Sequence, residues 1–230
     1  MQGTESTFNL AYVFVDLGDP FYRAATHEMV KSARRVMPGV KITQISDKKT
    51  PAHPLVDDLF SADIEVTKDD ICAFKGHFMA EFAMHCPGQL VLCDVDLIWN
   101  RNPFPIGFYE GNCVGLMRRD GFPSMPFNAG LILSRGENGH YEWWRNYQAI
   151  VDDLHKYGVG WYCDQFALTM TEHEHPYEAG WYRSLSMDEW AAAPDKLPTE
   201  PMNSYATHFK GSRKEWLFEY AKLVTPKVAA

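Results

Sequence analysis

Apolar and polar positions alternate along the chain in blocks that predict strands and helices by turns. Near-continuous apolar runs are typical of strands in a sheet that is covered on both faces, and they occur at residues 8–17, 89–99, 112–117 and 127–134. Shorter strands are expected at 40–45, 64–66 and 181–186. Apolar residues at helical spacing predict helices at 21–36, 68–85, 141–157, 161–170 and 214–223.

The opening of this pattern is a β-α-β unit. Asp19 is a helix N-cap with Pro20 at the first helical position, and Pro38 and Gly39 end the helix before the second strand. The pattern as a whole predicts an α/β fold in which helices flank a central mixed, mostly parallel sheet. No repeat or Pro/Gly/Ser linker divides the 230 residues, so we expect a single domain, 1–230, with its core at about 8–217.

Two acids interrupt the apolar run at 89–99. Asp94 and Asp96 are one residue apart, so in a strand their carboxylates share a face about 7 Å apart. Like charges that close repel, and a hard divalent cation such as Mg²⁺ or Mn²⁺ removes the conflict. The alternative is an acidic strand end that faces solvent, and the spacing alone does not decide between them.

Further candidates lie where ligands bind in open α/β sheets, beyond the carboxyl ends of the strands. Asp16 and Asp47 follow the first two strands, where they can contact a ribose or base, or can serve a turn. Lys75 lies on the helix before the acidic run, where it is either a phosphate contact or a solvated helix lysine. The chain lacks both Gly-x-Gly-x-x-Gly and a P-loop, which disfavours a dinucleotide or P-loop site.

Composition narrows the class of protein. A net charge of −8 argues against a nucleic-acid binder. Five cysteines, an odd number without a Cys-x-x-Cys, argue against a disulfide framework or zinc knuckle. The start of the chain has no signal-peptide pattern, and no apolar run approaches the ~20 residues of a membrane span. We therefore expect a cytoplasmic protein without a transmembrane segment; its oligomeric state is not predicted.

Four motifs in one order give the chain a family resemblance. They are an amino-terminal β-α-β with the early aromatic Tyr22, the strand ending in Asp94-Val-Asp96, Phe127-Asn-Ala-Gly130 followed by Asp164-Gln165, and His208-Phe-Lys-Gly-Ser-Arg-Lys214. In this order the sequence resembles GT-A fold glycosyltransferases, most closely family eight, the glycogenin and lipopolysaccharide galactosyltransferase group. The resemblance covers about residues 9–216. It departs at Glu215, where the group usually has proline.

The resemblance implies a metal site. Asp94, Asp96 and His208 would hold a Mn²⁺ or Mg²⁺ that bridges the diphosphate of a nucleotide sugar. An imidazole in the ligand set favours Mn²⁺ over Mg²⁺. A histidine in isolation is more often structural, so the ligand role of His208 depends on its motif and on the acid pair.

The resemblance also implies the substrate contacts. Lys214, and Gly211 through its backbone, would contact the diphosphate. Asn128 and Gln165, with Asp164, would face the transferred sugar and the acceptor. Without the resemblance, Asn128 can be a turn residue and Asp164-Gln165 a polar helix face.

The function expected from the resemblance is metal-dependent glycosyl transfer. The donor would be a nucleotide-diphosphate sugar, a UDP-sugar by preference, and the acceptor a glycan, protein or small molecule. Retention at the anomeric carbon is expected, by a front-face mechanism. The alternative is a double displacement, for which Asp164 is the carboxylate to test as nucleophile. Alternative hypotheses are a nucleotidyltransferase of the same fold, an Asp-x-Asp phosphatase and a non-catalytic nucleotide-sugar binder. The first of these usually carries a glycine-rich loop where this chain has Asp16-Leu-Gly-Asp-Pro20.

Overall fold

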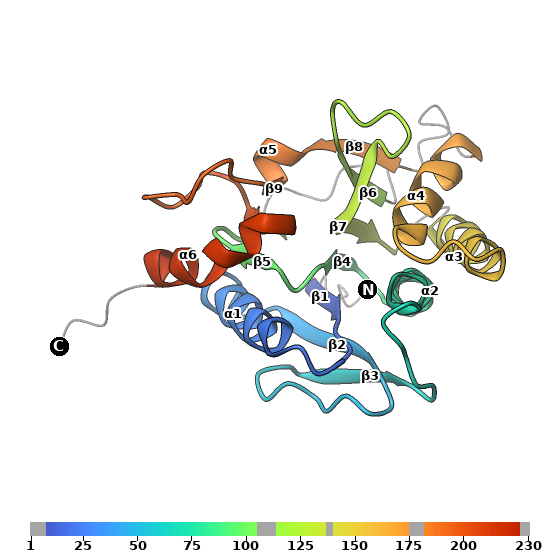
Figure 1. The fold of residues 1–230 in the computed structure, drawn as a ribbon, viewed down its shortest axis with the longest axis horizontal. Coiled ribbons are helices and arrows are strands. Elements are labelled where there is room, and N and C mark those ends of the chain that lie inside the picture. Colours follow the sequence, from blue (N-terminus) through green and yellow to red (C-terminus); the bar gives the residue numbers. More distant parts are fainter. Residues whose placement is uncertain (1–7, 105–113, 137–139, 175–181, 226–230) are drawn as a thin grey trace, which may run out of the picture.

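A seven-stranded sheet forms the centre of the molecule. The computed structural model describes residues 8–104, 114–136, 140–174 and 182–225. The sheet has the order β3-β2-β1-β4-β7-β6-β8, and helices cover both of its faces (Figure 1). Its strands are β1 (Phe8–Val13), β2 (Lys41–Asp47), β3 (Asp58–Ala62), β4 (Gln89–Cys93), β6 (Val114–Arg118), β7 (Phe127–Arg135) and β8 (Tyr182–Ser186).

The remaining elements are a small second sheet and the helices. The second sheet has the order β5-β10-β9, made of β5 (Leu97–Trp99), β10 (Ala206–His208) and β9 (Ala191–Ala192). The helices are α1 (Pro20–Val36), α2 (Ile71–His85), α3 (His140–Lys156), α4 (Cys163–Glu174), α5 (Met187–Trp190), the 3₁₀ helix η3 (Gly211–Trp216) and α6 (Leu217–Val224).

The strand directions confirm the predicted fold class. β1 runs parallel to β2 and to β4. The pairs β2–β3 and β6–β8 are also parallel. In the large sheet, as far as the structure describes it, only β7 is antiparallel to its neighbours, which are β4 and β6. The predicted β-α-β opening is present as β1, α1 and β2, and the Asp19 side chain accepts the N-cap hydrogen bond from the Phe21 N–H at 2.9 Å.

Both faces of the sheet are buried, which explains the uninterrupted apolar runs. In β4, Val91 and Cys93 belong to the core on the α1 side, and Leu90 and Leu92 to the core that α2, α3 and α4 cover. Figure 1 shows these two helical layers on opposite faces of the sheet. Because the side chains on both faces of such a strand pack against apolar layers, its sequence shows no alternation of apolar and polar residues.

Helix α1 also ties the small sheet to the large one. The Arg35 guanidinium in its last turn donates a hydrogen bond to the Trp99 carbonyl of β5 at 2.6 Å and another to the Val224 carbonyl of α6. The Ser32 hydroxyl accepts the Trp99 N–H at 3.0 Å. These contacts fix β5, and so fix the segment that connects it to β4.

Several predicted elements differ from the observed ones. The first strand, expected at 8–17, ends at Val13. The run at 89–99 is two strands in two sheets, with a break at 94–96. The strand expected at 64–66 lies at 58–62, where a half-exposed edge position gives it little apolar signal. The irregular stretch expected at 172–203 contains the end of α4, α5 and β9. The expected strand starts at 112–113 and 181 fall outside the described residues, and the domain limits stay a prediction.

In the described ranges, no helix combines the length and apolar character that crossing a bilayer would need.

Candidate metal centre

The segment Asp94-Val95-Asp96 lies where the chain passes from one sheet to the other. The Asp94 N–H donates to the Gly130 carbonyl at 2.8 Å and so extends the β4–β7 ladder. The Asp96 carbonyl accepts the Phe209 N–H at 2.9 Å and so extends the β5–β10 ladder. Each acid is therefore held by the backbone of a different sheet, and the two carboxylates meet at the junction.

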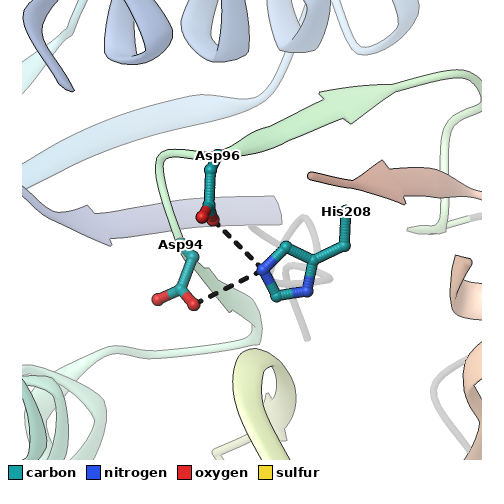
Figure 2. A group of neighbouring side chains, drawn as sticks. All are labelled: Asp94, Asp96 and His208. Carbon is teal, nitrogen blue, oxygen red and sulfur yellow. Dashed lines mark hydrogen bonds and ion pairs between the residues drawn. The ribbon is translucent and has the colours of Figure 1, made fainter. Parts of the chain in front are cut away.

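His208 reaches this junction through strand pairing. In the antiparallel β5–β10 pair, His208 lies opposite Leu97, the residue directly after Asp96. Its Nε2 lies 3.1 Å from Asp96 Oδ1 and 3.7 Å from Asp94 Oδ2 (Figure 2). One ligand atom from each of the three residues lies within 4.8 Å of the others. A solvent-facing pair of acids is excluded for Asp96, which is 8% exposed.

The electrostatics keep Asp96 ready to accept a cation. Burial alone would raise the pKa of its carboxyl group, but His208 and Lys214 outweigh burial and lower that pKa. Two carboxylates and an imidazole are an oxygen and nitrogen donor set that suits a divalent metal ion. The His208 Nδ1 is buried and has no hydrogen-bond partner in the described ranges, so the ring is oriented by its strand and its packing.

Gly130 makes room for the three side chains. A Cβ at this position would lie 2.3 Å from the His208 Cε1 and 2.9 Å from the Asp94 Oδ2. It would also lie 2.6 Å from the Oδ1 of Asn128, and that oxygen accepts the Gly130 N–H at 2.8 Å. The backbone of β7 thus forms one wall of the site. Asn128 is 5% exposed and lies at the same wall.

Lys75 and Asp164 extend the site on the Asp94 side. The Lys75 Nζ lies 2.5 Å from Asp94 Oδ1 and 3.2 Å from Asp164 Oδ2. Burial would lower the pKa of the Lys75 amine, but these two carboxylates raise it well above its usual value. Burial raises the pKa of Asp164, which is 3% exposed. The alternative of a solvated Lys75 is therefore wrong: its side chain is 15% exposed and bridges two acids.

The start of α4 positions Asp164 and its neighbour Gln165. The Asp164 Oδ1 accepts the Gln165 N–H at 2.9 Å, and the Tyr162 carbonyl accepts the same N–H at 3.0 Å. Tyr162 has φ +70°, a left-handed conformation that is rare for a bulky residue and common at functional sites. The Gln165 Oε1 is buried without a hydrogen-bond partner among the residues that the structure covers.

Lys214 borders the site on the Asp96 side. Its Nζ lies 3.8 Å from Asp96 Oδ2, donates to the Tyr22 hydroxyl at 2.5 Å and lies 4.5 Å from the centre of the Tyr22 ring. Burial would lower the pKa of Lys214, but the Tyr22 hydrogen bond and the Asp96 charge raise it. Gly211 begins η3 with φ +63°, a conformation that favours glycine at this turn.

Asp16 and Asp47 lie at the strand ends where they were expected. The Asp47 Oδ1 accepts hydrogen bonds from the Thr50 N–H at 3.0 Å and the Thr50 hydroxyl at 2.6 Å, which is turn chemistry. Asp16 pairs with Arg23 at 2.7 Å, and the Arg23 hydrogen bond lowers the pKa of its carboxyl group. No described contact joins either acid to the metal centre, so their nucleotide roles stay predictions.

Sequence reasoning gave no role to two residues that shape this site. Gly130 carries a recognisable signal, because a glycine inside a strand often marks a close approach of another group. Tyr22 marks the resemblance, but its hydrogen bond to Lys214 joins residues 192 positions apart. A local pattern carries no information about such a pairing.

We predict that Lys75→Met lowers the free energy of unfolding by roughly 3 kcal/mol at neutral pH, because the buried Asp164 and the partly buried Asp94 lose their amine partner. The raised pKa of Lys75 keeps its stabilising charge complete at neutral pH. The deficit should shrink in acid as the Asp164 carboxyl group, whose pKa burial raises, takes up a proton. Chemical denaturation measures it. Lys41→Met is the matched control, since Lys41 and Asp58 form an exposed pair at 2.8 Å worth at most about 1 kcal/mol. Equal losses in the two variants would contradict the buried bridge.

We predict that Gly130→Ala weakens Mn²⁺ binding roughly tenfold or more, as expected when the surroundings of metal ligands are disturbed. The added methyl group collides with the ring of His208 and displaces it. Titration calorimetry with Mn²⁺ measures the effect. Gly39→Ala is the control, because a Cβ there meets no atom within 4 Å. Unchanged Mn²⁺ affinity in Gly130→Ala would show that His208 is not needed in its observed place.

Solved structures similar to this chain identify its fold. No protein-family model and no curated protein matches the sequence. Among solved structures, a glycosyltransferase involved in glycosylation of the major capsid of PBCV-1 is 11% identical with a TM-score of 0.64, over 94% of this chain and 98% of that one. The galactosyltransferase LgtC, with donor and acceptor sugar analogues, is 13% identical with a TM-score of 0.61, over 96% and 98%.

A third similar structure is mouse xyloside xylosyltransferase 1, which is 14% identical with a TM-score of 0.57, over 89% of this chain and 98% of that one. The similarity extends over nearly the full length of all three glycosyltransferases, although their names and descriptions give different sugars and acceptors. At these low identities the match concerns the fold. The chain has the GT-A fold of the glycosyltransferases, as its four motifs predicted.

Proposed function

We propose that this protein is a metal-dependent glycosyltransferase that takes a sugar from a nucleotide-diphosphate sugar, with UDP as the preferred nucleotide. The acceptor is a glycan, a protein or a small molecule. The observation that carries the proposal is the convergence of Asp94, Asp96 and His208, with their ligand atoms within 4.8 Å, in a fold shared with glycosyltransferases.

The three residues fit a divalent cation in charge and in chemistry. Asp96 and Asp94 supply anionic oxygens, and the Nε2 of His208 points between them (Figure 2). The imidazole favours Mn²⁺ over Mg²⁺. A bound cation at this place would neutralise charge on a diphosphate leaving group.

Lys214 and Gly211 serve the diphosphate in this proposal. The raised pKa of Lys214 keeps its ammonium charged, and its contact with Asp96 places it next to the metal ligands. Negative charge grows on the diphosphate as the sugar departs. A fixed ammonium there stabilises the transition state more than the bound donor. Gly211 offers a backbone N–H at the start of η3.

The residues on the Asp94 side serve the transferred sugar and the acceptor. Asp164 is tied to Lys75 and to the Gln165 N–H, which suits it to accept a hydrogen bond from a sugar hydroxyl. Asn128 has its Oδ1 engaged by Gly130, so its amide nitrogen is the group for substrate. Lys75 orients Asp94 and Asp164, and we assign it this positioning role rather than a phosphate contact.

The proposal includes retention at the anomeric carbon. Among the described residues on the sugar side, Asp164 is the carboxylate that the proposed metal does not use, and its contacts with the Lys75 amine and the Gln165 N–H engage both of its oxygens. It is thus better placed to hold a hydroxyl group than to attack the sugar. The acceptor would then attack on the face from which the diphosphate leaves. Asp164→Asn should lower activity without the complete loss expected of a nucleophile.

We predict that UDP or a UDP-sugar stabilises the protein against heat only when Mn²⁺ is present. At about 100 times the dissociation constant, the ligand should add ~2.7 kcal/mol. A panel of nucleotides and nucleotide sugars, each with and without Mn²⁺ or Mg²⁺, measures this by thermal unfolding. Asp96→Asn should abolish the effect. Asp63→Asn, which changes a carboxylate that is 99% exposed, should keep it. If no nucleotide stabilises the protein with any divalent cation, the proposed function is wrong.

A further inference from the structure

The segment after β10 carries positive charge beyond what the metal and the diphosphate use. Lys210 and Arg213 occupy two of the four variable positions in His208-x-x-Gly-x-x-Lys214. A third cationic side chain, Arg119, directly follows β6. The Lys210 ammonium interacts electrostatically with both arginines and with Asp94 and Asp96.

The extended backbone of this segment puts the Lys210 side chain on the same side as His208. Its backbone is extended, with φ −85° and ψ 154°, so side chains alternate in direction here. Phe209 is fully buried in the cluster under α6, and His208 and Lys210 lie on the other side. The Lys210 side chain is partly buried, and within the described ranges its ammonium has no hydrogen bond and no ion pair.

Arg119 is fixed in place with part of its guanidinium unused. Its Nε and Nη2 donate to the Met125 carbonyl at 3.1 and 2.7 Å, and its Cζ lies 4.8 Å from the centre of the Phe122 ring. Its charge interacts with Tyr162 and Asp164, so it lies on the sugar side of the site. Among the described residues, its Nη1 has no partner, and no carboxylate lies within ion-pair distance.

Arg213 closes the group from the η3 side. Its Nε donates to the Pro194 carbonyl at 2.6 Å, and its Nη2 lies 3.3 Å from Asp195 Oδ1. Asp195 is 97% exposed, so this ion pair is screened by water and contributes little. The Pro194 carbonyl positions the guanidinium. Because its ion pair with Asp195 is weak, the guanidinium can still bind another anion.

The acids near these cations are already engaged. Asp94 is paired with Lys75, and Asp96 with His208 and Lys214. A divalent cation and the diphosphate of one donor roughly cancel each other in charge. Like charges near one another repel, and the described ion pair of Arg213 with the exposed Asp195 offsets little of this repulsion. An anion between these cations would relieve the repulsion.

We propose that Arg119, Lys210 and Arg213 form a second anion-binding subsite, next to the diphosphate, for a carboxylate or phosphate group of the acceptor or of the transferred sugar. The inference rests on the proposed function and specifies its substrates. Two guanidinium groups and an ammonium can bind one carboxylate or phosphate group through several charge-assisted hydrogen bonds. A neutral sugar would leave these donors without charge compensation.

Two pairs of probes test the subsite by titration calorimetry. Glucose 6-phosphate against glucose tests the acceptor, and UDP-glucuronate against UDP-glucose, both with Mn²⁺, tests the transferred sugar. The acceptor probes are measured with and without Mn²⁺ and UDP. We expect the anionic member of at least one pair to bind about tenfold more tightly than its neutral partner, as for charge-assisted hydrogen bonds. Which pair responds identifies the source of the anion.

Variants decide whether the three cations cause the preference. Lys210→Gln and Arg119→Gln should remove the preference and leave UDP affinity within about twofold. Arg118→Gln is the matched control, because Arg118 is 61% exposed and its nearest acid, Asp120, is fully exposed. Equal binding of anionic and neutral probes overturns the inference. The inference is also overturned if Lys210→Gln loses as much affinity for UDP as for the anionic probe, because Lys210 would then bind the diphosphate. Failure of UDP itself to bind contradicts the proposed function instead, while the acceptor probes without nucleotide still test the anion preference.

Discussion

The site depends on one constraint: two carboxylates are held where two sheets meet. Asp94 is fixed by β7 of the large sheet, and Asp96 by β10 of the small one. Neither backbone can move without breaking a ladder. The acids therefore cannot separate to relieve their repulsion, and the protein must place cations around them. This requirement explains why the neighbourhood of the pair is dense in positive and ionisable groups.

The cations divide the site into two sides. Lys75 engages Asp94 and connects it to Asp164, while Lys214 engages Asp96 and is held by Tyr22. Without metal the carboxylates are thus already paired, so the folded state does not need the ion to avoid buried unpaired charge. A cation that binds must share the acids with these amines. In the proposed function, the residues on the Asp94 side serve the sugar and those on the Asp96 side serve the diphosphate.

How far the sequence predicts this arrangement depends on how local each feature is. The β-α-β opening follows from neighbouring residues, since Asp19 and Pro20 define the helix start whatever lies elsewhere. The convergence of Asp94, Asp96 and His208 follows from the order of motifs, although Asp96 and His208 are 112 positions apart in the chain. The break within 89–99 does not follow, because strands of two sheets are equally apolar when both are buried. The bridge that Lys75 makes depends on helix packing, and helical periodicity gives no sign of it.

Pulsed electron paramagnetic resonance of Mn²⁺ in the complex with protein and UDP is the sharpest test of the proposed metal site. One bound Mn²⁺ should show coupling both to phosphorus of the diphosphate and to an imidazole nitrogen. The nitrogen coupling should disappear in His208→Gln and persist in His53→Gln, whose imidazole lies on the partly exposed loop after β2. Bound Mn²⁺ with phosphorus coupling but no nitrogen coupling in the unaltered protein would contradict a site built from Asp94, Asp96 and His208.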